Sequence, residues 1–163
     1  MTAYDAAPWH DLFVASAGAA AALVGLLVVA VSINVKNILE SPGLPSLAAR
    51  SIGLILGLLL LSLLTLFPGQ SRTVLGVEIL ALGIVLVIAT GFSVARSHFP
   101  VERLRWTLPA TALALVSTAP MVVAGATLLA GAGGGLYWAG AELIVGFAVA
   151  IYNAWILLIE ILR

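Results

Sequence analysis

Residues 12–34 read "LFVASAGAAAALVGLLVVAVSIN", a run of 23 residues without a charged side chain. A helix of about 20 predominantly apolar residues is long enough to cross the hydrocarbon core of a bilayer. Four more segments have this character, at about 47–67, 73–95, 106–130 and 136–162. The sequence therefore predicts an all-α integral membrane protein: a five-transmembrane-helix bundle in which residues 1–163 form a single transmembrane domain.

The composition supports a bilayer as the solvent. Of the 163 residues, 63% are hydrophobic and 9% are charged, whereas a soluble domain carries about 25% charged residues. The net charge is zero, and the basic residues stand singly, without the clustered basic footprint of a nucleic-acid-binding protein. There is no cysteine, which excludes disulfides and thiolate metal sites. We predict the lipid bilayer as a partner, and no nucleic acid.

Basic residues predict the orientation of the chain, because lysine and arginine concentrate on the cytoplasmic side of a membrane protein. The amino-terminal segment and the "GAGGG" connection at 131–135 carry none, and the connection at 68–72 carries only Arg72. The other connections and the carboxyl terminus carry Lys36, Arg50, Arg96, Arg103, Arg105 and Arg163. This pattern places the amino terminus outside and the carboxyl terminus inside, as an odd number of spans requires.

Two acids lie within apolar runs, Glu78 in "GVEILALG" and Glu142 in "GAELIVG". Both are expected roughly 7–10 Å into their helices, at 1.5 Å of rise per residue, and Asp11 enters the first span at the same level. A charged group at this depth normally faces the bundle interior, a partner or water. We predict an outer layer of carboxylates that shares a proton or holds a cation. The alternative is that the glutamates extend towards the lipid headgroups.

A second polar layer is expected near the inner surface. Asn153 follows Glu142 by eleven residues, which places both on one face of the last span. At its inner end this face would meet Asn34 of the first span and Arg50 of the second. Asparagine also serves simply as interhelical glue in membrane proteins, and this alternative stays open. The candidates for lining a permeation path or binding an ion are Glu78, Glu142, Asn153 and Asp11, with Asn34 and Arg50 forming the inner polar layer.

Small residues recur at helical spacing in the first two spans. Gly18, Ala22 and Gly25 share one face of the first span, and Gly53 and Gly57 form a GxxxG pair in the second. Small residues allow helices to approach closely in lipid. These faces serve either packing within one chain or an interface with a second copy or another membrane protein.

The fourth span carries Pro120 at its centre. Proline removes a backbone hydrogen bond and crowds the preceding turn of a helix. Most sharp kinks in helices have such a cause. We predict a kink at Pro120.

Several activities lack the residues that they require. The only lysine, Lys36, lies in a connection, so no intramembrane Schiff base can form. His10 and His98 are predicted at opposite surfaces, which excludes haem held by two histidines. The glycines at 131–135 follow a helix rather than a strand and do not form a phosphate-binding loop. We predict no catalytic residue, no cofactor and no bound metal, and hence a protein that is not an enzyme.

The opening "WHDLFVASAGAAAALVGLLVVAVSIN" resembles the start of a group of small, uncharacterised bacterial membrane proteins. The resemblance covers the first span and implies a multi-pass protein of the bacterial inner membrane, with no activity attached.

The residues favour one function and leave one main alternative, with an intramembrane enzyme as a third class. The first is a homo-oligomeric protein for permeation of an ion, a proton or a small solute, as a channel or a carrier. The alternative is a non-catalytic accessory or scaffold subunit, or a modulator, of a larger membrane complex.

Overall fold

The computed structural model describes residues 2–40, 43–96 and 104–161, with side chains described for 2–40, 43–93 and 116–159. These residues form helices and connections without a strand, so the prediction of an all-α chain is confirmed. The elements in chain order are η1 (Thr2–Tyr4), η2 (Ala7–Trp9), α1 (His10–Ile33), α2 (Val35–Glu40), α3 (Leu44–Thr65), α4 (Arg72–Arg96), α5 (Leu104–Ala130) and α6 (Leu136–Ile161).

Four helical segments are long and apolar enough to cross a membrane. They are Ala7–Ile33, Leu44–Thr65, Arg72–Ser93 and Leu136–Ile159. The helix α5 has 27 residues, and within the described side chains its apolar part is Val116–Ala130. The structure thus contains the helices expected of a multi-pass membrane protein.

The short helix α2 lies in a segment that the sequence analysis treated as a connection. It follows Asn34, whose φ of −108° and ψ of 16° interrupt the helical geometry after α1. A helix of six residues is too short to show the periodic apolar pattern from which longer helices are predicted.

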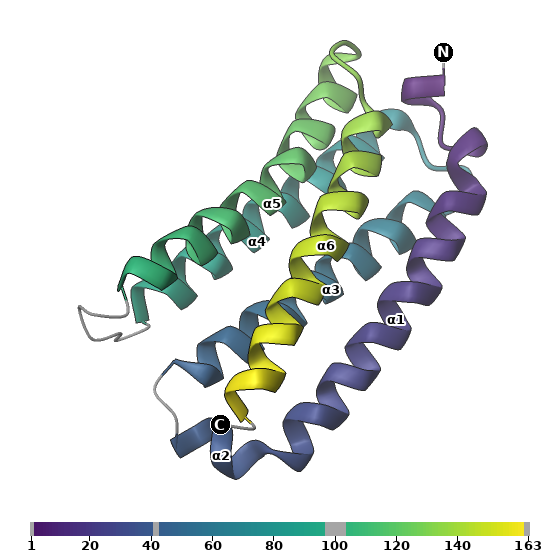
Figure 1. Cartoon of the computed structure of the whole chain (residues 1–163). Helices are drawn as coiled ribbons and strands as arrows, with labels where there is room; N and C mark the ends of the chain where they lie inside the picture. Colours follow the sequence, from purple (N-terminus) through teal and green to yellow (C-terminus); the bar gives the residue numbers. More distant parts are fainter. Residues whose placement is uncertain (1, 41–42, 97–103, 162–163) are drawn as a thin grey trace.

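The helices form a bundle around α3 (Figure 1). Helix α1 packs mainly against α3, which also contacts α4 and α6, and α5 packs against both α4 and α6. The amino terminus lies at one end of the bundle, with the connections 66–71 and 131–135; we call it the N-terminal end. The opposite end carries α2 and the carboxyl terminus, and we call it the α2 end.

Glycine positions explain the close pairing of α4 with α5. A Cβ atom added at Gly125 would stand 2.5 Å from the backbone nitrogen of Leu80, and one at Gly83 would stand 3.1 Å from that of Val122. No larger residue fits such backbone contact without a shift of the helices. These glycines allow the two helices to approach each other in the half of the bundle near the N-terminal end.

The small residues predicted for packing in α1 lie on its outer side. Gly18, Ala22 and Gly25 are exposed, and a Cβ at either glycine would meet nothing within 4 Å. The residues that α1 buries are Phe13, Ser16, Ala20 and Leu27. Within a single copy of the chain, the small-residue face of α1 therefore packs against none of the residues that the structure describes.

The two glycines of α3 differ from each other. Gly57 is buried against Leu86 of α4 and serves the predicted role in packing, whereas a Cβ at Gly53 would meet nothing within 4 Å.

On α5, the backbone stays α-helical on both sides of Pro120. The kink at this proline stays a prediction.

Candidate functional site

Glu142 lies seven residues into α6, about 9 Å along the helix axis. Its side chain is 0% exposed. The backbone amide of Met121 on α5 lies beside the carboxyl, but neither carboxyl oxygen makes a hydrogen bond of good geometry with any described residue. An isolated charge in an apolar interior is costly, so this group requires a proton, a cation or an opposite charge.

The two other candidate acids have different surroundings. Glu78 is half-buried and accepts a short hydrogen bond from the side-chain amide of Gln70. Asp11 is exposed, because α1 buries the face that carries Phe13 instead. Among the described residues, no three His, Cys, Asp or Glu side chains lie close enough to hold a metal ion. The structure therefore does not gather Asp11, Glu78 and Glu142 into one cation site.

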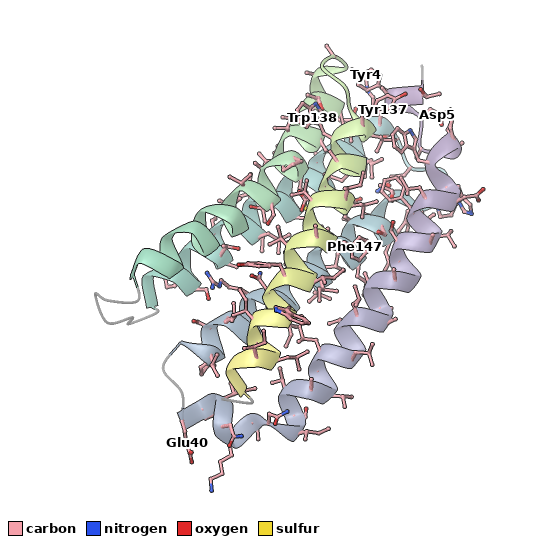
Figure 2. All side chains as sticks on the ribbon, viewed as in Figure 1. Tyr4, Asp5, Glu40, Tyr137, Trp138 and Phe147 are labelled. Atoms are coloured by element: carbon pink, nitrogen blue, oxygen red, sulfur yellow. The ribbon has the colours of Figure 1, made fainter. Side chains whose placement is uncertain are left out.

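Aromatic side chains cover the bundle at the N-terminal end (Figure 2). The ring of Trp9 packs edge-on against Tyr137, with 4.9 Å between the ring centroids, and its indole nitrogen donates to the carbonyl oxygen of Thr2 at 2.8 Å. The hydroxyl of Tyr4 accepts a hydrogen bond of 3.2 Å from the backbone amide of Gly134. We call Tyr4, Trp9 and Tyr137 the aromatic cap.

The aromatic cap lies directly over the start of α6. A Cβ added at Gly140 would stand 3.1 Å from the ring of Trp9, and Gly140 precedes Glu142 by two residues. The guanidinium of Arg72 sits 5.9 Å from the centre of the Tyr4 ring, which holds the cap to α4 by a cation–π contact. These contacts close the N-terminal end of the bundle above Glu142.

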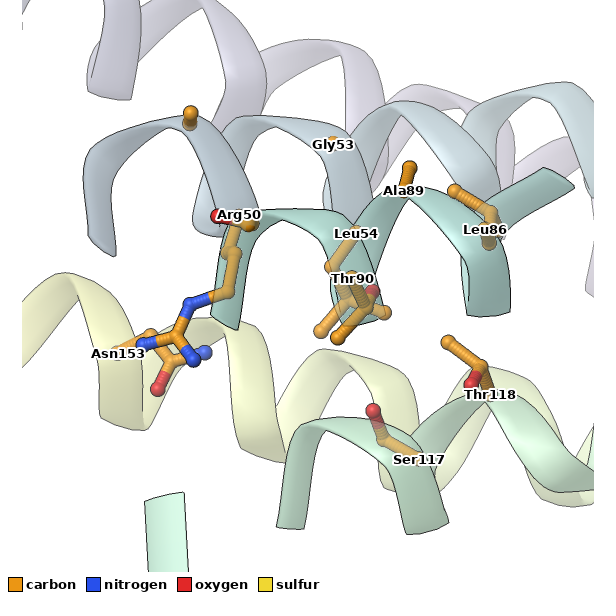
Figure 3. A pocket seen from close by; sticks show the side chains of 11 residues that line it. Arg50, Gly53, Leu54, Leu86, Ala89, Thr90, Ser117, Thr118 and Asn153 are labelled. Carbon is orange, nitrogen blue, oxygen red and sulfur yellow. The ribbon is translucent and has the colours of Figure 1, made fainter. Parts of the chain in front are cut away.

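A pocket of about 170 Å³ lies between α3, α4, α5 and α6, in the half of the bundle near the α2 end (Figure 3). We call it the Arg50 pocket. It is lined by Ala49, Arg50, Gly53, Leu54, Leu86, Ala89, Thr90, Ser93, Ser117, Thr118 and Asn153.

Arg50 and Asn153 supply the strongest polar groups of this pocket. The Nε and Nη1 atoms of Arg50 are buried and have no hydrogen-bond partner among the described residues. Its guanidinium points towards Asn153 (Figure 3), which is 3% exposed. The structure therefore brings together two of the three residues expected in the inner polar layer.

Asn34 lies apart from this pair. Its side-chain nitrogen donates to the carbonyl oxygen of Ala30, one turn earlier in α1, at 2.9 Å, and it does not line the Arg50 pocket. Asn34 follows α1, whereas the residues that line the pocket come from α3, α4, α5 and α6. Its amide stabilises the last turn of α1.

Hydroxyl side chains line the Arg50 pocket at positions that the sequence analysis did not assign to a site. Thr90 and Ser93 come from α4, and Ser117 and Thr118 come from α5. Ser93 donates to the carbonyl oxygen of Ser46 at 3.4 Å and so joins α4 to the start of α3. The spacing of Thr90 and Ser93 within an apolar helix is the signal that would have indicated a polar face.

Comparison of the chain with protein-family models, with curated proteins and with solved structures gave no match. The fold and the buried polar groups define a class: a small helical bundle in which four helices of the described part of the chain are able to cross a membrane. Within that class, this chain buries the carboxyl group of Glu142 near one end and the Nε and Nη1 atoms of Arg50 near the other, and none of these atoms has a hydrogen-bond partner among the described residues.

Proposed function

We propose that the chain is a multi-pass protein of the bacterial inner membrane, with five spans, the amino terminus outside and the carboxyl terminus inside. It acts as a homo-oligomer and mediates permeation of an ion, a proton or a small solute. The path follows the buried face of α6 from Glu142 to Asn153.

The burial of Glu142 carries this proposal. A glutamate directed at lipid or headgroups would argue against a polar path, whereas this side chain is 0% exposed and neither of its oxygens makes a hydrogen bond of good geometry with a described residue. Such a group is rare in membrane helices and marks ion pathways and proton relays. Asn153 follows on the same face after about three helical turns.

Residues between these two are small enough to favour a path along α6. Gly146 and Ala150 lie on the same buried face, and a Cβ at Gly146 would clash with the side chain of Leu58 on α3. Leu58 therefore fills the space beside Gly146, and the proposed path requires its side chain to move.

Flux measurements in proteoliposomes test the proposal. Glu142→Gln keeps the size of the side chain and removes its acid, so we expect at least a tenfold loss of proton or cation flux, the usual scale for a positioned proton-transfer group. The control is Glu40→Gln on the exposed helix α2, which keeps the wild-type flux. Wild-type protein that conducts no more than empty liposomes, or Glu142→Gln at wild-type flux, would refute the proposal.

One observation favours the alternative of an accessory or scaffold subunit. The small-residue face of α1 is exposed along Gly18, Ala22 and Gly25, as a face that docks on another membrane protein would be. This alternative predicts no flux, and loss of a co-purifying partner in Gly18→Leu or Gly25→Leu. Permeation by a homo-oligomer instead predicts a defined mass of several copies by native mass spectrometry.

A further inference from the structure

We infer that the Arg50 pocket is a binding site for one small oxyanion, of the carboxylate or phosphate class. The inference goes beyond the permeation proposal, because it assigns a ligand to a pocket whose occupancy can be measured without any flux. It rests on the guanidinium of Arg50, on the amide of Asn153 and on the size of the pocket.

The charge of Arg50 requires a partner. Guanidinium keeps its proton in proteins, and its Nε and Nη1 atoms are buried here with no acceptor among the described residues. None of the acidic residues whose side chains the structure describes lines the pocket. Glu142 lies eleven residues from Asn153 along α6, Glu78 accepts a hydrogen bond from Gln70, and Asp5, Asp11 and Glu40 are exposed. A buried charge without a counter-charge is strongly disfavoured, and an anion in the pocket supplies one.

The shape of the donors selects an oxyanion over a halide. Guanidinium presents its N–H groups as a planar fork that binds two oxygens of one carboxylate or phosphate. The side chain of Asn153 is 3% exposed. It adds an amide N–H donor on the side towards which Arg50 points (Figure 3). Thr90 brings a hydroxyl to the same wall.

The volume limits the size of the ligand. At about 170 Å³, the pocket is similar to an engineered cavity of about 150 Å³ that holds benzene. Acetate, bicarbonate or phosphate fits this space. The exposed residues Ala49 and Ala89 lie on its wall, where a phospholipid could also insert the phosphate of its headgroup while its acyl chains stay outside.

Calorimetry on detergent-purified full-length protein tests the site, with inorganic phosphate and acetate as probes and chloride as the comparison. We expect saturable binding of at least one oxyanion, and binding at least about tenfold weaker in Arg50→Gln, since a charge-assisted bidentate contact is lost. The matched control is Arg72→Gln, which removes an arginine at the N-terminal end and leaves affinity unchanged. Asn153→Ala weakens binding and serves as the second test if Arg50→Gln fails to fold.

Native mass spectrometry distinguishes a free oxyanion from a lipid headgroup. The protein is reconstituted in nanodiscs that contain phosphatidylglycerol and released from them in the spectrometer, and the mass of the protein with any retained lipid is measured. An anionic lipid retained by wild type and by Arg72→Gln, but lost from Arg50→Gln, identifies a headgroup phosphate as the oxyanion. The inference is overturned if neither free oxyanion nor anionic lipid binds the wild type, or if both arginine variants bind equally well.

Discussion

Glu142 and Arg50 both bury polar atoms that have no hydrogen-bond partner among the described residues, but their surroundings in the two halves of the bundle differ. Around Glu142 the helices are closely packed, and the aromatic cap closes the N-terminal end. Around Arg50 the helices leave a pocket of about 170 Å³. The difference indicates two ways to accommodate such a group. A closely enclosed carboxyl, as at Glu142, requires a proton, a cation or an opposite charge, whereas a guanidinium, as at Arg50, is accommodated by a pocket with room for a ligand.

The largest expected loss of stability comes from a larger residue at Gly125, in the closely packed half of the bundle near the N-terminal end. Gly125→Val places side-chain atoms where a Cβ alone stands 2.5 Å from the Leu80 nitrogen, so the α4–α5 pair must separate. We expect a loss of about 3 kcal/mol in the free energy of unfolding, at the upper end for overpacking. Gly53→Ala on the wall of the pocket, where nothing lies within 4 Å, should stay within about 0.5 kcal/mol of wild type. Chemical unfolding in detergent measures both, and equal losses would contradict the comparison.

Replacing Glu142 with an apolar residue of similar length tests whether burial of its carboxyl group lowers the stability of the protein. Glu142→Met removes two buried acceptors that have no partner, and such groups cost about 1–3 kcal/mol each to bury. We expect the variant to unfold at a higher denaturant concentration than wild type. Glu78→Met, which breaks the hydrogen bond with Gln70, should lose about 1 kcal/mol. If Glu142→Met is the less stable of the two, Glu142 has a partner that the structure does not show.

The sequence predicted the helices well and the geometry of the site only in part. Long apolar runs determine where helices form, because lipid solvates no free backbone group. The side-chain contacts depend on how each helix is rotated, which composition does not reveal. Asp11 was expected with Glu142, but α1 buries the face of Phe13 and leaves Asp11 exposed.

The inner polar layer was also predicted only in part. Arg50 and Asn153 share a pocket, as was expected for the inner end of the face that carries Glu142 and Asn153, because α3 and α6 are in contact. Asn34 is absent from it, since its amide bonds to Ala30 of its own helix. Hydrogen bonds within one helix compete with contacts between helices, and the sequence does not show which will form.

The aromatic cap should govern access to Glu142. The chain has no cysteine, so a single cysteine placed at a chosen position is a clean probe. Trp9→Ala removes the ring that covers Gly140, so the end of the bundle above Glu142 becomes less covered. We expect Glu142→Cys to react with a thiol reagent about tenfold faster in this background than with Trp9 present, which corresponds to a barrier lower by about 1.4 kcal/mol. Tyr152→Ala, on the exposed side of α6, is the control and should leave the rate unchanged.

The smallest effect is expected on the outer face of α1. Gly18→Leu adds a side chain where nothing lies within 4 Å, so the stability of the isolated chain should change by no more than about 0.5 kcal/mol. An effect on assembly without an effect on stability, seen as a lower native mass, would identify this face as an interface between copies. A large loss of stability would show that the face packs within the chain.

Thiol accessibility at the two ends of the buried α6 face tests the central contrast most directly. Glu142→Cys and Asn153→Cys are each treated with a negatively charged and with a positively charged methanethiosulfonate reagent. The reagent is added to both sides of the membrane of the proteoliposomes. We predict that the cysteine at 153 reacts, and faster with the negative reagent, whereas the cysteine at 142 stays protected from both. A reactive cysteine at 142 together with a protected one at 153 would contradict the contrast between an enclosed Glu142 and an accessible Arg50 pocket. A preference at 153 for the positive reagent would contradict a positively charged pocket.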